Sequence, residues 1–393
     1  MRVLFITSRF PGDLRRGDQL RAYHQLRCLS ARHAITLLAF DHVGSDPALV
    51  RELEACCERV IMVDRKPAHM LVRLLGALGG STPLQAAMYA SPTLHAELTR
   101  LLESSRFDLV HLQMARLGAL LPHLRQLPCV LDLIDALSLN MARRAEFDHG
   151  PMRYLARIEA SRLPAYERML CAQVRYAAVS AAPDQKAIGS VISNLRLVSN
   201  GVDLDLFPFA PHPRHGADIV FVGNLGYFPN VDAATWFAHE VMPLLLARSA
   251  HATLSLVGAR PPVSLRRLAA RAPHVQMVGP VAQVHPYLAR AAVAVAPMRA
   301  GSGQQIKIFE AMAAGTPVVA TSLAAAGLEV EHGRHLLVAD GAEAFAAAVV
   351  RLLDDPDLAA TLAKNARALV KQRYTWACSN EALEKLWLMA VAQ

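Results

Sequence analysis

Short apolar runs alternate with longer amphipathic stretches along the chain of 393 residues. The runs are rich in Val, Ile and Leu, which is typical of parallel strands that are covered on both faces. In the first half, the predicted strands are Val3–Thr7, Ile35–Phe40, Val60–Val63, Leu109–Leu112, Val130–Ile134, Tyr176–Val179 and Leu195–Val198. An amphipathic helix is predicted at Gln19–Ala31, between the first two strands. A strand–helix–strand start favours a doubly wound parallel sheet.

The same alternation restarts after residue 210. The predicted strands of this second block are Ile219–Val222, Thr253–Val257, Val275–Val278, Ala292–Ala296, Val318–Ala320 and Leu336–Val338. Between the blocks, Pro208, Pro211 and Pro213 cannot continue a helix or a central strand. We therefore predict two consecutive α/β domains, residues 1–200 and 214–375, joined by a linker at 201–213. A last helix, at 376–393, either completes the second domain or folds back on the first.

Composition supports a folded chain, since 53% of the residues are apolar and 19% are charged. No apolar run approaches the roughly 18 residues that a membrane-spanning helix needs. The six cysteines form no CxxC pair, so we expect reduced, buried thiols without a disulfide framework or a zinc site. These features predict a globular cytoplasmic protein.

Almost all of the net charge of +8 lies in the first half, where residues 1–200 hold 25 basic and 18 acidic side chains. Aromatic residues are only 6% of the chain, so the stacking platforms of nucleic-acid binders are not evident and no nucleic-acid partner is expected. An anionic membrane surface or a phosphorylated substrate fits better. Two basic helical stretches, Met141–Tyr176 and Arg65–Leu75, are candidates for contact with the inner membrane face. The alternative is a solvated helix face with extended arginine side chains.

The strongest candidate chemistry follows the predicted strand Ala292–Ala296. A small-residue loop, Gly301-Ser302-Gly303, leads into a predicted helix from Gln304 to Ala314, which Gly315 and Pro317 end. Free amides and the positive end of a helix dipole at such a turn bind phosphate groups. The alternative is a glycine turn that only makes a tight connection.

Lys307 and Glu310 lie three residues apart on one face of this helix. Lysine before glutamate is the poorer orientation for a helix ion pair, and lysine in the first turn opposes the dipole. A site that needs a cation against phosphate and a carboxylate against a vicinal diol explains both residues. The alternative is an ordinary surface ion pair.

The segment from Gly301 to Ala320, GSGQQIKIFEAMAAGTPVVA, resembles the donor-site signature of retaining GT-B glycosyltransferases of the group-one type. The resemblance extends to Phe221–Asn224, Asn200–Asp203 and Asp108–His111, and so to most of the chain. It implies two Rossmann-like domains that face each other across a cleft. It also implies transfer of a sugar from a nucleotide-sugar donor to a hydroxyl of a glycan or lipid-linked acceptor, with retention, in cell-surface polysaccharide synthesis.

The resemblance implies a role for individual residues. Glu310 would bind the ribose, and Lys307 with the backbone of Gly301, Ser302, Gly303 and Gln304 would face the diphosphate and the sugar. Further donor-side positions are Gly223, Asn224, Gly12 and Gly17. His111, at the end of its strand, would point into the cleft near the sugar. Independently of the resemblance, Asp132 and Asp135 lie three residues apart at a strand end, where α/β sheets place ligands, so one of them, with Asp135 favoured, could orient an acceptor hydroxyl or act as a base. Asp18 and Arg21 are further candidates for binding the acceptor. Asp132, in the same DLID stretch, has the alternative role of capping a turn.

Three positions depart from the pattern of the family. Ser302 stands where members carry the first of two glutamates, and Asn224 and Asn230 stand where many carry Arg and Lys. Neutralisation of the diphosphate would then fall on Lys307 and on further cations among Arg9, Arg15, Arg16 and Arg299. These departures leave open a non-catalytic GT-B protein that binds partners in a polysaccharide assembly complex. A sugar-nucleotide epimerase of the same general fold is a third reading.

Metal and cofactor signals are weak. Asp203-x-Asp205 could hold Mg²⁺ or Mn²⁺ on a sugar diphosphate, but acidic residues beside prolines are often turn formers. The resemblance implies donor binding without a metal, and we expect no cofactor. The chain has no HExxH, GxSxG or first-turn GxGxxG motif, which argues against a zinc protease, an α/β-hydrolase and a dinucleotide oxidoreductase.

Overall fold

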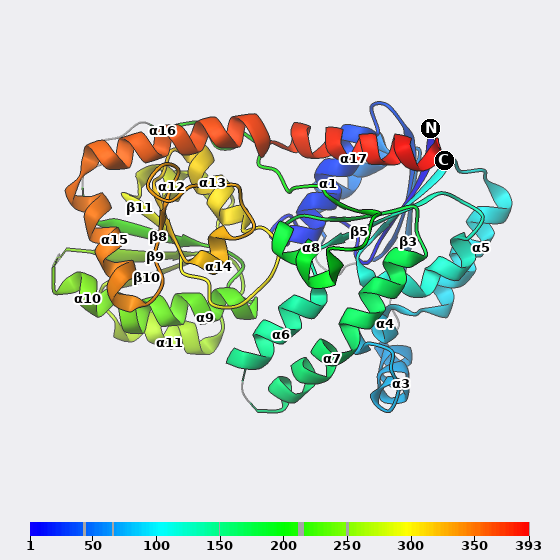
Figure 1. The fold of residues 1–393 in the computed structure, drawn as a ribbon, viewed down its shortest axis with the longest axis horizontal. Coiled ribbons are helices and arrows are strands. Elements are labelled where there is room, and N and C mark those ends of the chain that lie inside the picture. The colour runs from blue at the N-terminus through cyan, green and yellow to red at the C-terminus, as the bar shows by residue number, and fades with distance from the viewer. Residues whose placement is uncertain (42–44, 65–66, 149, 211–215, 249–250, 393) are drawn as a thin grey trace. The chain divides into compact units, whose positions relative to one another are not determined.

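The structure is a computed structural model, and it describes the chain except residues 42–44, 65–66, 149, 211–215, 249–250 and 393 (Figure 1). The chain divides into two compact units. Unit 1 comprises Met1–Ser199 together with Ser379–Gln393, and unit 2 comprises Asn200–Cys378. No helix of the described residues is long and apolar enough to cross a membrane.

Unit 1 is built on a parallel sheet of seven strands in the order β3-β2-β1-β4-β5-β6-β7. The strands are β1 (Arg2–Thr7), β2 (Ala34–Phe40), β3 (Arg59–Val63), β4 (Leu109–Gln113), β5 (Cys129–Ile134), β6 (Tyr176–Val179) and β7 (Leu195–Leu197). Each of these strands was predicted to within a residue at either end. The register places Val3 opposite Ile35 on one side and Leu109 on the other.

Helices cover both faces of this sheet. They are α1 (Gly17–Leu29), α2 (Pro47–Cys56), α3 (Pro67–Leu78), α4 (Leu84–Tyr89), α5 (Pro92–Ser104), η1 (Ala115–Leu124), α6 (Leu137–Phe147), α7 (Gly150–Ala172), α8 (Ala182–Gly189) and α17 (Trp376–Val391). Because successive side chains of a strand point to opposite faces, β1 contributes to two cores. Phe5 packs in one cluster with Leu26 and Trp387, and Leu4 packs in the other with Leu98 and Leu163.

Unit 2 has a parallel sheet of six strands in the order β10-β9-β8-β11-β12-β13. Its strands are β8 (Asp218–Val222), β9 (Thr253–Val257), β10 (Val275–Gly279), β11 (Val293–Ala296), β12 (Val318–Ala320) and β13 (Leu337–Val338). Its helices are α9 (Phe228–Trp236), η2 (Phe237–Val241), α10 (Met242–Leu246), α11 (Val263–Arg271), α12 (His285–Arg290), α13 (Ile306–Ala314), α14 (Ser322–Ala325), α15 (Ala342–Asp354) and α16 (Pro356–Arg373). The prediction of two parallel α/β units is confirmed.

The basic stretch and the predicted linker both differ from the sequence-based expectations. The basic stretch Met141–Tyr176 forms two helices, α6 and α7, and the second ends at Ala172 because Tyr176 begins β6. Within the predicted linker, Val202 and Phe207 are buried in the core of unit 2, and Pro211 to Pro213 lie outside the described residues.

The cysteines are less uniformly buried than expected. Cys57, Cys129 and Cys171 are buried, whereas Cys28, Cys56 and Cys378 are half-buried, and all six are free thiols. The closest approach that the structure records is 4.0 Å, between the Sγ atoms of Cys56 and its neighbour Cys57.

Candidate functional site

The predicted phosphate loop lies at the carboxyl edge of the unit 2 sheet, between β11 and α13. Gly301 has φ = 109° and Gly303 has φ = 70°, values that residues with a Cβ rarely adopt. Helix α13 begins at Ile306, two residues later than expected. Gln304 therefore lies in the loop before the helix, where its Oε1 accepts from the Asn200 amide at 2.7 Å and its Nε2 donates to the Gly327 carbonyl at 3.1 Å. Gln304 thus ties the loop to its surroundings, while Ser302 is half-buried within it.

The other end of α13 follows the sequence closely. Gly315 has φ = 76° and takes the left-handed C-cap position that was predicted for it. A Cβ at this glycine would lie 2.6 Å from the ring of Phe209, so space as well as backbone conformation requires glycine. The helix is therefore held at both ends, with its N-terminus at the sheet edge.

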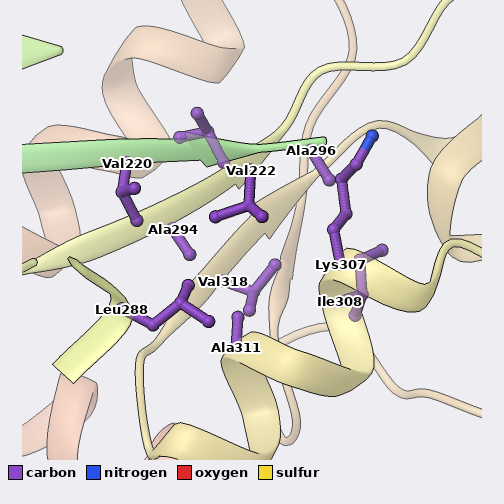
Figure 2. A pocket seen from close by; sticks show the side chains of 10 residues that line it. Val220, Val222, Leu288, Ala294, Ala296, Lys307, Ile308, Ala311 and Val318 are labelled. Carbon is purple, nitrogen blue, oxygen red and sulfur yellow. The ribbon is translucent and has the colours of Figure 1, made fainter. Parts of the chain in front are cut away.

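Lys307 lies in the first turn of α13, and its side chain is largely withdrawn from water. Its Nζ donates to Asn230 Oδ1 at 2.5 Å and lies 4.7 Å from the centroid of the Phe221 ring. Figure 2 shows the stem of Lys307 beside Ala296 at the rim of a small apolar hollow, with the amino nitrogen directed away from the aliphatic side chains. Burial lowers the pKa of Lys307 to about 7, against the opposing effect of Glu310.

Glu310 is one turn further along α13 and is half-buried. Burial raises the pKa of Glu310 to about 7, and the charge of Lys307 acts in the opposite direction. Within the described part of the chain, no hydrogen bond to this carboxylate is recorded, so the fold leaves its oxygens available to a ligand. Perturbed pKa values at a sheet edge mark candidate functional residues.

The loop after β8 extends the site through two asparagines. Asn230 Nδ2 donates to the Asn224 carbonyl at 2.9 Å, while its Oδ1 accepts from Lys307. Asn224 Oδ1 in turn accepts from the Gly226 amide at 3.0 Å. A Cβ on Gly223 would lie 3.0 Å from Asn230 Nδ2, so glycine permits this close approach. The predicted donor-side residues Gly223, Asn224 and Lys307 are therefore brought to one edge, with Asn230 as the link between them.

Arg299, one of the cations suggested for the diphosphate, is engaged elsewhere. Its Nε and Nη2 donate to the two carboxylate oxygens of Asp232 at 3.0 and 2.6 Å. The guanidinium also lies 5.7 Å from the centroid of the Trp236 ring. Such a bidentate pair fixes the guanidinium on α9.

His111 does not have the place that the sequence predicted. It is the third residue of β4 and is fully buried, not a strand-end residue that points into a cleft. Its Nδ1 accepts from Trp387 Nε1 at 3.1 Å, and its ring lies 4.2 Å from that of Phe5. Burial lowers the pKa of His111 to about 4, so the ring is neutral. The prediction that His111 contacts the sugar is wrong, because a fully buried ring beneath α17 cannot touch a substrate.

Arg21 also differs from the expectation of acceptor binding. Its side chain is fully buried, and Nε donates to Asp132 Oδ2 at 2.7 Å. Its Nη1 and Nη2 donate to the carbonyls of Ser199 and Val198 at 2.9 and 3.0 Å. Arg21 and Asp132 therefore form a buried ion pair, and Arg21 also binds the backbone at Val198 and Ser199. The assignment of Arg21 to the acceptor is wrong, because its side chain is fully buried.

The remaining predicted residues of unit 1 lie at the carboxyl edge of its sheet. Gly17 is exposed at the start of α1, and Asp18 beside it binds Arg9 Nη1 at 3.2 Å. Asp135 is half-buried directly after β5. Gly12, in the same loop as Gly17, would place a Cβ 2.5 Å from Ser45, so it serves close packing. Arg15 and Arg16, the other suggested cations, both lie within ion-pair distance of Asp13.

Sequence reasoning missed Gln113, the last residue of β4. Its side chain is 2% exposed, and its Nε2 has no hydrogen-bond partner among the described residues. Met114, which follows it, has φ = 79°, and Ile134 at the end of β5 has φ = 66°. Strained backbone of this kind concentrates at functional sites. The available signal was a polar residue at the end of an apolar strand, but the sequence-based assignment went to His111, two residues before it.

The Asp203-x-Asp205 motif forms a local turn, since the Asp205 amide donates to Asp203 Oδ1 at 2.9 Å. Among the residues that the structure describes, no group of three or more His, Cys, Asp or Glu side chains could hold a metal ion.

Comparison with known proteins points to one family. Residues 216–355 match the model of the family described as "Glycosyl transferases group 1". A phosphatidyl-myo-inositol mannosyltransferase of Mycolicibacterium smegmatis is 32% identical over 199 residues, which cover 48% of this chain and 50% of that protein. A GDP-mannose-dependent alpha-(1-6)-phosphatidylinositol monomannoside mannosyltransferase of Mycobacterium tuberculosis is 31% identical over 206 residues, 47% of this chain and 53% of that protein. The chain spans about half the length of the curated relatives it matches.

Solved structures match over nearly the whole chain. Sucrose-phosphate synthase from Thermosynechococcus elongatus has a TM-score of 0.75 at 18% identity and covers 100% of this chain and 99% of its own. Alr3699/HepE of Anabaena, in complex with UDP and glucose, has a TM-score of 0.68 at 18% identity, with 98% of each chain covered. At these identities the likeness concerns the fold. The chain has the GT-B fold, and residues 216–355 of its second unit match the glycosyl transferase group 1 family.

Proposed function

We propose that the protein is a nucleotide-sugar-dependent glycosyltransferase whose donor binds at the carboxyl edge of the unit 2 sheet. One observation carries the proposal: Lys307 and Glu310 lie on one half-buried face at the start of α13, behind a loop with two left-handed glycines. Burial disfavours the charged form of both side chains, whereas a bound nucleotide would use both of them. The family match covers this same segment.

The proposed roles follow from the chemistry of each group. Glu310 accepts the ribose hydroxyls, and Lys307 with the amides of the Gly301–Gln304 loop binds the diphosphate. The sugar is transferred to an acceptor hydroxyl with retention, and no protein nucleophile is assigned. The residues named here stabilise negative charge as the diphosphate leaves, and they hold the reactants in position. No metal or other cofactor is part of the proposal, because amides and a cation serve the diphosphate directly.

GDP-mannose is the first donor to test, with UDP-glucose as its rival. The proposal of GDP-mannose rests on the printed name of a relative that is 31% identical over 47% of this chain. The proposed acceptor is a glycan or a lipid-linked saccharide, and the name of the phosphatidylinositol monomannoside mannosyltransferase relative supports the lipid-linked saccharide. Cell-surface polysaccharide synthesis is the proposed setting. Asp135 and Asp18, at the carboxyl edge of the unit 1 sheet, are the proposed acceptor-side residues.

The decisive experiment measures donor binding and turnover together. We expect GDP or UDP, and the matching sugar conjugate, to raise the melting temperature of the wild type, and Glu310→Ala to abolish that shift. A nucleotide at about 100 times its Kd adds roughly 2.7 kcal/mol to the free energy of unfolding. Full turnover and full donor affinity in Glu310→Ala would refute the assignment of the site.

A second candidate function is a non-catalytic GT-B protein in a polysaccharide assembly complex. Ser302 and the two asparagines favour it, because they supply no charge where the family pattern has Glu, Arg and Lys. A donor-hydrolysis assay separates the two, since active transferases transfer sugar slowly to water. Nucleotide binding without any hydrolysis or transfer would support the non-catalytic protein.

We also propose that unit 1 contacts an anionic membrane at the cytoplasmic face. Helices α3 and α7 form one surface, because Leu74 and Leu155 pack in a common small cluster. This surface exposes Val72 at 70% and Tyr154 at 66%. Arg153 and Arg157 lie on the same α7, whereas Arg65 and Lys66 lie outside the described residues.

We expect the wild type to co-sediment with anionic vesicles, and added salt to weaken this binding. The double variant Val72→Ser with Leu75→Ser should stay in the supernatant, while its nucleotide binding stays unchanged. Wild type that stays in the supernatant would refute this contact.

A further inference from the structure

A nucleoside diphosphate brings more negative charge to the site than Lys307 alone can balance. Lys307 is only partly protonated near neutral pH, because burial lowers its pKa to about 7. Arg9, Arg15 and Arg16, which were also suggested for the diphosphate, belong to unit 1 and not to this edge of the unit 2 sheet. The asparagines of the β8–α9 loop are neutral. A further cation at this edge would complete the site.

Arg260 lies at that edge, in the loop between β9 and α11, and its side chain is exposed. Strand β9 is the direct neighbour of β8, so the two loops that follow them are adjacent. They are in contact, because a Cβ on Gly258 would lie 1.7 Å from the Gly223 carbonyl oxygen. No side chain could be placed between them at this point.

The stem of Arg260 lies directly against the asparagine-lined loop. A Cβ on Gly226 would lie 3.0 Å from Arg260 Cβ and 3.3 Å from Asn224 Oδ1. Arg260 and Asn224 therefore flank the same glycine. Asn224 is linked through Asn230 to the amino group of Lys307. A guanidinium on this stem has the length to extend over the same edge of the sheet.

The backbone of Arg260 gives an independent indication. Its φ is 61°, a left-handed value that glycine adopts without cost and arginine does not. Only Met114 and Ile134 share this feature among the non-glycine residues that the structure describes, and both also follow or end a parallel strand at its carboxyl end. Glycine would adopt this backbone conformation without strain. An arginine at such a position therefore indicates that its side chain has a functional role.

We propose that Arg260 binds the diphosphate of the nucleotide sugar, together with Lys307 and the Gly301–Gln304 loop. The inference rests on the proposed function and names a residue that supplies permanent charge from the β9–α11 loop. Arginine suits this task because its planar guanidinium binds two phosphate oxygens at once and stays protonated at any physiological pH.

The test compares the binding of nucleoside diphosphates, nucleoside monophosphates and pyrophosphate. Wild type, Arg260→Ala and Arg260→Gly are titrated calorimetrically with GDP, UDP, their monophosphates and inorganic pyrophosphate. Arg267→Ala, which removes an exposed arginine from α11, is the matched control. We expect both Arg260 variants to bind the diphosphates and pyrophosphate at least tenfold more weakly, with a much smaller loss for the monophosphates. Arg260→Gly should melt at the same temperature as the wild type or higher, because glycine relieves the left-handed strain.

Each outcome separates this inference from the proposed function. Diphosphate binding at wild-type strength in both Arg260 variants overturns the role of Arg260 and leaves the proposed function intact. An equal loss for monophosphates and diphosphates also overturns it, since the residue would then act on the nucleoside or on the fold. Pyrophosphate binding that depends on Arg260, in a wild type that binds no nucleotide, supports the anion site and refutes the proposed function. A wild type that binds neither nucleotide nor pyrophosphate overturns both.

Discussion

At the scale of single residues, Lys307 and Glu310 at the proposed donor site affect the stability of the fold through their shifted pKa values. Burial moves the pKa of the lysine down and that of the carboxyl up, each to about 7. The folded state therefore binds protons more strongly than the unfolded chain at Glu310, and less strongly at Lys307. As the pH rises, the contribution of Glu310 to stability falls between its ordinary pKa and 7, and that of Lys307 rises above 7. The contribution of the pair is lowest near pH 7.

We therefore expect Lys307→Met to be more stable than the wild type at pH 7 and to bind nucleotide at least tenfold more weakly. Methionine keeps most of the apolar stem and removes the desolvated charge, so stability and binding move in opposite directions. Chemical denaturation and calorimetry measure the two quantities. Lys364→Met, at an exposed position of α16, should change neither. A variant that loses stability and binding together would show that the amino group supports the fold.

The residues also show what sequence reasoning could reach. The motif predicted that Lys307 and Glu310 lie on one helix, and the structure places both on α13, because their spacing is local. The assignments of His111 and Arg21 failed because their surroundings come from distant segments, Trp387 for the histidine and Asp132 for the arginine. Arg260 gave no signal, since nothing in a sequence shows that an arginine has a left-handed φ.

At the scale of elements, the strands and the Gly315 C-cap of α13 were predictable, whereas the caps of the α4 and α6 N-termini were not. A buried parallel strand is a continuous apolar run, so its position can be read from the sequence to within a residue. The N-termini of α4 and α6 lack side-chain caps of their own, at Pro83 and Ala136. Helix α7 supplies both: Glu159 accepts from the Leu84 amide at 2.6 Å, and Glu167 from the Ser138 amide at 3.1 Å. Contacts of this kind join residues far apart in sequence.

Glu167→Ala should therefore destabilise unit 1 by about 1–3 kcal/mol, because it leaves buried donors on α6 without an acceptor. Burial raises the pKa of Glu167 to about 7, so its contribution to stability decreases as the pH rises from its ordinary pKa to 7. Glu167→Gln keeps an acceptor without the charge, and should recover part of the loss at pH 8. Urea unfolding at pH 5 and pH 8 measures these differences. Wild-type stability of the alanine variant at both values would contradict the capping role.

At the scale of the whole molecule, unit 1 is completed by the last helix of the chain. Trp387 of α17 is fully buried, packs in a cluster with Phe5 and donates to His111. Arg21 holds the carbonyl of Ser199, and Ser379 Oγ donates to the same oxygen. The chain therefore leaves and re-enters unit 1 at one hydrogen-bonded point.

Trp387→Ala should cost about 3–5 kcal/mol, since it opens a cavity under α17 and leaves His111 Nδ1 without its donor. Leu388→Ala is the matched control, because Leu388 is the next residue of the same helix and is 52% exposed. Thermal unfolding of the two variants measures the difference. If both variants melted together near the wild-type temperature, α17 would not be part of the core of unit 1.

The return of α17 also bears on synthesis at the ribosome. Unit 2 is one continuous segment, Asn200–Cys378, while unit 1 needs residues that are translated after it. Unit 1 is thus the first to begin synthesis, but it can complete its fold only after unit 2 has been translated. Until Trp387 leaves the exit tunnel, the nascent chain carries an uncovered apolar face around Phe5 and His111, which is a surface that chaperones recognise. A chain that is cut short directly after Cys378 would therefore contain a complete unit 2 and an unfinished unit 1.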